Sequence, residues 1–232
     1  MVSIGHFAKL FSLLRCCFTK QDRKNFCIPK KFRIFAFQME KNLYIIGGCN
    51  GAGKTTASFT VLPEVLGCRE FVNSDEIAHG LSPFNPSSVM QAAGRIMVSR
   101  IRELLGKGET FAIETTLSRT YAILVRQAHS KGYIVTLIFF WLRTPELALQ
   151  RVAERVSNGG HDIPAPTTRR RYVAGINNFF ELYADTVDCW VIYDNSVSPR
   201  ILVARGGKDV PTTVSDDELF TKIKSYVRQR NT

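Results

Sequence analysis

The sequence predicts an α/β fold with a doubly wound parallel sheet, and three observations lead to this class. Short apolar, β-branched segments alternate with longer segments of helical pattern between residues 43 and 200. The first of these segments runs directly into a glycine-rich turn. Polar and acidic residues follow several of the others, as expected where parallel strands end at one edge of a sheet. The composition, 45% hydrophobic and 22% charged over 232 residues, is typical of a globular chain.

Each strand is predicted from an apolar run that is too short to be a helix. The expected strands, in chain order, are Leu43–Ile46, Phe71–Asn73, Phe111–Glu114, Ile134–Leu142 and Trp190–Tyr193. A further strand is possible at Ile201–Ala204, and a closing helix is expected from Asp216. No apolar run approaches the ~20 residues needed to cross a bilayer, so no membrane span is expected.

The formal charge of +11 is concentrated in residues 1–38, which carry eight basic residues and one acid. The basic pI therefore describes this leader more than the rest, and an interpretation as a nucleic-acid-binding protein loses most of its force. We expect a leader at 1–38 and one domain at 39–232. Three interpretations of the leader stay open: a basic amphipathic arm, a disordered tail, or a wrongly assigned extension upstream of a start at Met39.

The six cysteines include no CxxC pair and no spacing typical of zinc. Free thiols in a reducing compartment are expected, which favours a cytoplasmic location.

The glycine-rich turn is a phosphate-binding loop of the form G-x-x-x-x-G-K-[ST]. Glycines let backbone N–H groups surround phosphate oxygens, and the following helix presents its positive end to the same anion. The motif predicts binding of a nucleoside triphosphate, with Lys54 on the β- and γ-phosphates and Thr55 on Mg²⁺. The residues expected to bind the nucleotide are Gly48, Cys49, Asn50, Gly51, Ala52, Gly53, Lys54, Thr55 and Thr56. Oxidation of Cys49 is a further hypothesis for blocking ATP.

Two acidic residues at strand ends are candidates for acceptor chemistry. Asp75 follows the second strand, where a carboxylate can deprotonate a hydroxyl for attack on the γ-phosphate; the alternative is a helix cap. Glu114 and Thr115 follow at the end of the third strand, and both are expected to contact the acceptor. Glu114 would bind acceptor hydroxyls or a Mg²⁺-bound water; the alternative is an acid satisfied by nearby backbone N–H groups. Arg95 is expected to help hold the acceptor. The alternative, given equal weight, is a salt bridge on the surface or between helix and sheet.

Five arginines flank a turn-rich segment after the fourth strand, and they predict a lid at about 151–172. Arg151 and Arg155 share one helix face, and Arg169, Arg170 and Arg171 begin the next helix. Arginine is suited to gripping phosphoryl oxygens during transfer, and Arg155 and Arg171 are assigned this role. A solvated basic hairpin is the alternative. His161, in the turn, is expected to stabilise the loop rather than to catalyse.

At this point the chain resembles the zeta-toxin family of phosphate-loop kinases, in its compact bacterial branch. The resemblance covers about residues 42–200. It rests on the phosphate loop, on Asn73-Ser74-Asp75-Glu76-Ile77-Ala78, Ala93-Gly94-Arg95, Glu114-Thr115-Thr116-Leu117, Gly132-Tyr133, Arg151-Val152, Arg155-Val156, Gly159-Gly160-His161-Asp162-Ile163-Pro164, Arg169-Arg170-Arg171-Tyr172 and Tyr193-Asp194-Asn195-Ser196.

The resemblance implies an adenylate-kinase-like core with an arginine-rich helical lid, ATP and Mg²⁺ as donor and metal, and Asp75 as the base. It places Glu114 toward the acceptor. Characterised members of the family phosphorylate the sugar hydroxyl of UDP-N-acetylglucosamine, so a small-molecule hydroxyl acceptor of that kind is expected, together with a possible antitoxin partner.

Two other classes stay open. A regulatory ATPase would depend on Asp194, at the end of the fifth strand, more than on Asp75. An ATP-dependent nucleic-acid-binding protein would use the leader and the arginines as a basic surface and show steeply salt-dependent binding. For the kinase, no stable nucleic-acid partner is expected.

Overall fold

The structure is a computed structural model that describes residues 40–157, 160 and 163–227. The leader at 1–38, the start at Met39 and His161 therefore lie outside the described residues. Among the described residues, no helix is long and apolar enough to cross a membrane.

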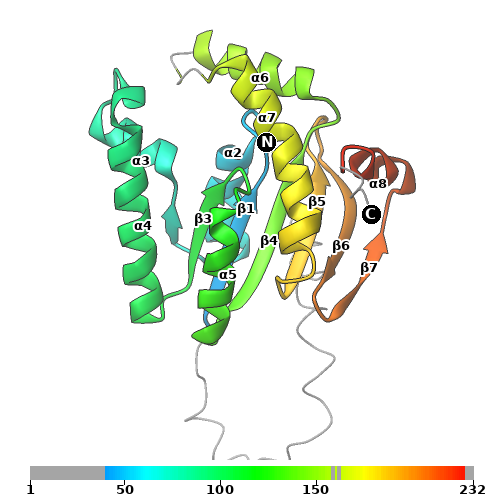
Figure 1. The fold of residues 1–232 in the computed structure, drawn as a ribbon, viewed down its shortest axis with the longest axis horizontal. Coiled ribbons are helices and arrows are strands. Elements are labelled where there is room, and N and C mark those ends of the chain that lie inside the picture. Colours follow the sequence, from blue (N-terminus) through cyan, green and yellow to red (C-terminus); the bar gives the residue numbers. More distant parts are fainter. Residues whose placement is uncertain (1–39, 158–159, 161–162, 228–232) are drawn as a thin grey trace, which may run out of the picture.

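The part of the chain that the structure describes is built around one seven-stranded sheet in the order β2-β3-β1-β4-β5-β6-β7 (Figure 1). The first five strands in the chain are parallel, and β6 and β7 continue the sheet antiparallel beyond β5. The bounds are β1 Asn42–Gly47, β2 Glu70–Val72, β3 Phe111–Thr115, β4 Ile134–Trp141, β5 Cys189–Asp194, β6 Ile201–Gly207 and β7 Val210–Val214. The α/β class and the five strands are confirmed, and so is the added strand at Ile201.

The expected count of about five strands was too low because β7 was not predicted. This strand contains Pro211 and its middle residues are exposed, so it lacks the apolar run that indicates a strand. The turn at Lys208-Asp209 joins it to β6 as a hairpin.

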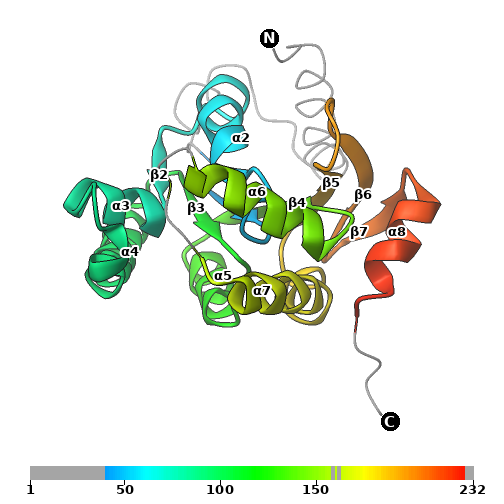
Figure 2. The same cartoon turned by 90° about the horizontal axis from the view of Figure 1, so that it is seen from above.

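Helices cover both faces of the sheet (Figure 2). Helices α5 and α7 lie on one face and α2 on the other, whereas α3 and α4 stand beside the β2 edge. The helices are α2 Lys54–Thr60, α3 Ser74–Leu81, α4 Met90–Lys107, α5 Thr120–Ser130, α6 Pro145–Ser157, α7 Ala165–Asn178 and α8 Asp217–Lys224, with short turns η2 Val61–Val65, η3 Pro86–Val89 and η4 Phe179–Tyr183. Asp216 caps α8 through its carboxylate, as the expected helix start requires.

The central strands are buried on both faces, as expected for a parallel sheet between helices. Leu43 and Ile45 of β1 have no exposed surface, and β4 is buried from Val135 to its end. A rigid sheet of this kind fixes the positions of the residues at its carboxyl end, and helix α6 crosses above that end (Figure 1). The polar residues that follow β1, β2 and β3 therefore meet in one place.

Candidate active site

The phosphate loop has the backbone conformation that its glycines permit. Residues 48–53 connect β1 to α2, and Gly48 has a φ of 144°. A Cβ on Gly48 would lie 2.3 Å from the carbonyl oxygen of Phe140 in β4, so this position accepts only glycine. The loop is therefore pressed against the neighbouring strand and held in place by it.

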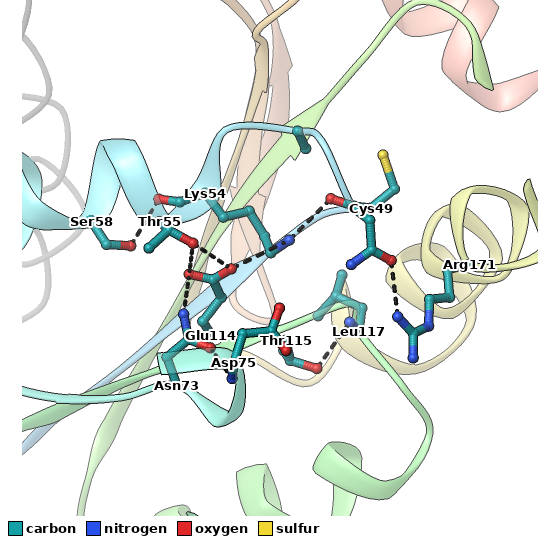
Figure 3. A network of polar contacts seen from close by, with 12 residues as sticks. Cys49, Lys54, Thr55, Ser58, Asn73, Asp75, Glu114, Thr115, Leu117 and Arg171 are labelled. Atoms are coloured by element: carbon teal, nitrogen blue, oxygen red, sulfur yellow. Dashed lines mark hydrogen bonds and ion pairs between the residues drawn. The ribbon is translucent and has the colours of Figure 1, made fainter. Parts of the chain in front are cut away.

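Lys54 and Thr55 lie at the start of α2 and face Glu114 (Figure 3). The Lys54 Nζ donates to the carbonyl oxygen of Cys49 at 3.0 Å and lies 3.5 Å from Glu114 Oε1. The Thr55 hydroxyl donates to the Glu114 carboxylate, with distances of 2.9 and 3.1 Å to its two oxygens. The side chains of Lys54 and Glu114 are 7% and 8% exposed, so this ion pair is buried.

Glu114 is thus placed beside the phosphate loop. Asn73 also donates to its Oε2 at 3.1 Å, which gives the carboxylate three different donors. Glu114 was expected to bind either acceptor hydroxyls or a Mg²⁺-bound water. These contacts favour the second role. Thr115, next in the chain, accepts a hydrogen bond from the backbone N–H of Leu117 at 3.1 Å. Leu117 has a φ of 56°, so the chain turns sharply after this strand.

Asp75 lies in the first turn of α3 and does not cap this helix. The cap is Asn73, whose Oδ1 accepts a hydrogen bond from the Asp75 backbone N–H at 2.9 Å. The Asp75 side chain is partly exposed and lines the cleft beside Lys54 and Glu114 (Figure 3). Asn73 therefore has the capping role that was the alternative for Asp75, and Asp75 lines the cleft without capping the helix.

A cleft of about 1670 Å³ lies over the carboxyl ends of the strands. Its lining includes residues from the phosphate loop, from the turn after β2, from 83–87 before α4, from the end of β3 and the turn after it (114–119), and from α7. The cleft thus brings together Lys54, Asp75, Glu114 and Thr115, which the sequence had placed at three separate strand ends.

The predicted arginines divide into two groups. Arg169, Arg170 and Arg171 of α7 line the cleft, and Arg171 donates to the Asn50 side chain in the phosphate loop at 3.0 Å. Arg169 also forms an ion pair with Glu146 of α6. Arg151 and Arg155 of α6 are not among the lining residues. Arg151 instead donates to the backbone carbonyls of Asn195 and Ser196.

Two other assigned residues lie away from the cleft. Arg95 is exposed on α4 and is not brought to the cleft with the other candidates. Asp194 has no exposed surface; it accepts hydrogen bonds from Arg143 and from the backbone of Ser196. A buried, paired Asp194 outside the cleft argues against the ATPase alternative, in which this residue would be the essential acid.

Several cleft residues were not predicted. Phe84 is fully exposed and lines the cleft from the loop before η3. Its signal in the sequence is a lone aromatic between Pro83 and Asn85 in a polar turn segment. Asn178 donates to the Leu117 carbonyl at 2.7 Å and supports the strained turn after β3. Its signal in the sequence, two consecutive asparagines late in a helix, is weaker than that of Phe84.

Cys49 is buried, and burial raises the pKa of its thiol to about 11. The thiol is therefore protonated at neutral pH, and a protonated thiol is a poor nucleophile toward oxidants. This argues against the hypothesis that oxidation of Cys49 regulates ATP binding.

The fold and this site define the class of the protein. A mostly parallel sheet whose central strand leads into a phosphate loop, with a carboxylate and arginines lining one cleft, is the arrangement of a phosphate-loop kinase. Residues 30–197 match the family described as zeta toxin, and the chain belongs to this family. It is an ATP-dependent kinase. The resemblance to the zeta-toxin family that the sequence indicated is confirmed.

Other proteins of known sequence or structure are similar to this chain, and the solved structures support the fold. A Haemophilus influenzae protein without assigned function is 29% identical over 135 residues, covering 58% of this chain and 94% of its own. The AvrRxo1-ORF1:AvrRxo1-ORF2 complex crystallised with sulphate ions matches with a TM-score of 0.63 at 20% identity, over 83% of this chain and 66% of that one.

The structure of the PezAT chromosomal toxin-antitoxin system of Streptococcus pneumoniae matches with a TM-score of 0.57 at 18% identity, over 100% of this chain and 91% of that one. This chain thus spans just under two thirds of the AvrRxo1 chain but most of the PezAT chain. At these identities, the structures show a shared fold.

Proposed function

We propose that this kinase transfers the γ-phosphoryl group of ATP to a hydroxyl of a sugar nucleotide similar to UDP-N-acetylglucosamine. The observation that carries the proposal is the Asp75 carboxylate, which lines the same cleft as Lys54 and has no capping role. A carboxylate so placed can take the proton of an acceptor hydroxyl as this hydroxyl attacks the γ-phosphate.

The donor side is formed by the phosphate loop and by α7. Backbone N–H groups of the loop and the start of α2 bind the phosphate oxygens, and Lys54 neutralises the β- and γ-phosphates. Arg171, held beside the loop by its hydrogen bond to Asn50, would contact the transferring group there. The expected closure of a lid at 151–172 is part of this proposal, with the arginines of α7 as its phosphate-binding group.

Mg²⁺ fits the residues beside the phosphate loop. Among the described residues, there is no group of three or more His, Cys, Asp or Glu side chains suited to a metal ion. The Thr55 hydroxyl and the Glu114 carboxylate are nevertheless adjacent oxygen ligands, and Mg²⁺ in kinases needs few protein ligands besides phosphates and water. When bound, the ion would neutralise charge on the phosphates, with Thr55 and Glu114 holding it.

Other residues that line the cleft suit an acceptor that has both polar and flat apolar parts. Thr115, Thr116 and Ser118 line the cleft and offer hydroxyl groups to sugar hydroxyls and phosphates. Phe84 offers an exposed aromatic face at the edge of the cleft, on which a nucleobase can stack. A sugar nucleotide satisfies both features, whereas a free sugar satisfies only the first.

The test is ATP consumption by the full chain with UDP-N-acetylglucosamine, with N-acetylglucosamine and without acceptor. We expect the sugar nucleotide to stimulate turnover and Asp75→Asn to lower kcat by about 10²- to 10⁴-fold, with ATP binding retained. A rate of ATP consumption that does not change when the sugar nucleotide is added would refute this acceptor. An unchanged kcat for Asp75→Asn would refute the role of Asp75 as the base.

We also propose that the kinase acts in the cytoplasm and has an antitoxin protein as partner. Among the cysteines that the structure describes, none forms a disulfide, which fits a reducing compartment. Support for the partner comes from the similarity to the PezAT toxin-antitoxin system. Expression of the chain in its host should arrest growth, and Asp75→Asn should not; equal growth with both would contradict toxicity and remove the reason for an antitoxin.

A further inference from the structure

We infer that Asn195 is a positioning residue for ATP binding: its side-chain amide holds the phosphate loop in the conformation that accepts phosphates. Asn195 directly follows β5, and its Nδ2 donates to the carbonyl oxygen of Ala52 at 2.8 Å. The two residues are 143 positions apart in the chain. This contact therefore joins the end of β5 to the middle of the phosphate loop.

The hydrogen bond fixes the direction of one backbone N–H. In a trans peptide the C=O and the following N–H point to opposite sides. Because the Ala52 carbonyl points at Asn195, the Gly53 N–H points away from Asn195. Successive N–H groups that share a direction form the concave anion site of a phosphate loop, so this bond supports the anion-binding geometry.

Gly53 makes the close approach possible. A Cβ at this position would lie 2.5 Å from the Asn195 Nδ2, and Gly53 has a φ of 77°. The second glycine of the motif is therefore needed for the Asn195 contact as well as for its own backbone conformation.

Asn195 is itself held firmly, which a positioning residue requires. Its backbone N–H donates to the Trp141 carbonyl at 2.9 Å, and its own carbonyl accepts from Arg151 Nη1 at 2.9 Å. Arg151 Nη2 also donates to the Ser196 carbonyl at 3.2 Å. The guanidinium thus bridges two consecutive carbonyls. Arg151, which was predicted to belong to the lid, therefore stabilises the loop after β5.

The buried Asp194 completes the support from the other side. Its Oδ1 accepts from the Ser196 backbone N–H at 2.9 Å, and its Oδ2 accepts from Arg143 Nε at 2.8 Å. The Arg143 backbone N–H donates in turn to the Ser196 hydroxyl at 2.8 Å. Residues 194–196 therefore form a rigid turn from which only the Asn195 side chain reaches the phosphate loop through a described hydrogen bond.

The test measures binding of ATP, inorganic triphosphate and adenosine to the full chain by calorimetry. Asn195→Ala removes the amide without adding charge, and we expect it to weaken ATP and triphosphate binding by about three- to tenfold, the effect of one net hydrogen bond. Asn195→Asp places a carboxylate against the Ala52 carbonyl, and it should weaken both ligands more. Adenosine binding should stay within about twofold, because it makes no use of the loop.

Asn42→Asp is the matched control. Its Nδ2 also donates to a backbone carbonyl, that of Glu40, but at the opposite end of β1 from the phosphate loop. It should leave all three affinities unchanged. Melting temperatures of all variants are measured alongside, since a purely structural Asn195 would lower stability and spare triphosphate affinity.

Triphosphate binding within twofold of the wild type in both Asn195 variants would overturn the inference. Equal losses for adenosine and triphosphate would also overturn it. Because no acceptor is present, neither result depends on the proposed sugar nucleotide.

Discussion

Replacing Glu114 with glutamine leaves a buried ammonium group without its charged partner. The Lys54 Nζ lies 3.5 Å from the Glu114 carboxylate, and both side chains are less than a tenth exposed. Glutamine has nearly the same shape, but its amide nitrogen would face the donors of Lys54, Thr55 or Asn73. The substitution therefore tests the charge and the acceptor capacity of this position without opening a cavity.

The expected loss of stability follows from the burial. Removing one partner of a buried ion pair costs about 3–5 kcal/mol. Lys54 keeps its hydrogen bond to the Cys49 carbonyl, and glutamine keeps one acceptor oxygen, so a smaller loss of about 2–3 kcal/mol is expected here. For a domain of this size, that corresponds to a decrease in Tm of about 4–12 °C.

The assay is thermal unfolding of the wild type, Glu114→Gln, Lys54→Met and the double variant, without nucleotide. The double variant should be more stable than the sum of the single effects predicts, because it leaves no unpaired buried charge. Glu103→Gln is the control, since Glu103 pairs with Arg100 and Lys107 on the exposed surface of α4 and should contribute little. A Glu114→Gln variant as stable as the wild type, or strict additivity, would refute the reasoning.

Three further predictions concern the acceptor, the lid and pH. Phe84→Ala should raise the KM for UDP-N-acetylglucosamine by about tenfold and leave the KM for ATP unchanged, because base stacking contributes about 1–3 kcal/mol. Steady-state kinetics with each substrate varied measure both values. An unchanged KM for the sugar nucleotide, or an equal rise in both KM values, would contradict an acceptor role for Phe84. Arg171→Ala should lower kcat/KM for ATP by about tenfold or more, because Arg171 lies beside the phosphate loop. Arg100→Ala on α4 is the control and should leave kcat/KM unchanged. Similar values for the two variants would contradict a contact between Arg171 and the phosphates. Burial raises the pKa of both Cys49 and Cys68 from the ordinary 9.0 to about 11. Between pH 9 and 11 the unfolded chain therefore binds fewer protons than the folded one, and the free energy of unfolding should fall as pH rises through this window. Denaturant unfolding at pH 8 and pH 10.5 checks this, and Cys49→Ala should reduce the pH dependence; a flat profile in the wild type would contradict the burial argument.

The sequence predicted the parts of the site that depend on local order along the chain. The phosphate loop follows from its residue spacing, and Asp75 and Glu114 follow from the rule that parallel strands end at one edge of a sheet. The sequence did not specify the direction of side chains that depend on tertiary packing. Arg151 and Arg171 belong to the same predicted cluster, yet one binds carbonyls after β5 and the other faces the phosphate loop.

Contacts between distant segments account for most of what was missed. The bond from Asn195 to the Ala52 carbonyl joins residues far apart in the chain, and no periodicity reports such a pair. Strand β7 was missed for a different reason: as a half-exposed edge strand it needs neither alternation nor an apolar run. Arg95 was assigned to the acceptor, but it is exposed on α4, and the rotation of that helix decides this position.

The two edges of the sheet limit how other chains can associate with this protein. On one side β2 has only three residues, and on the other β7 contains Pro211, which has no N–H to donate. Strand addition from a second chain, the usual start of edge-to-edge aggregation, is therefore disfavoured at both ends. We expect a partner protein to recognise helices and loops rather than to extend the sheet, so a binding segment would be selected by its side chains rather than by backbone pairing.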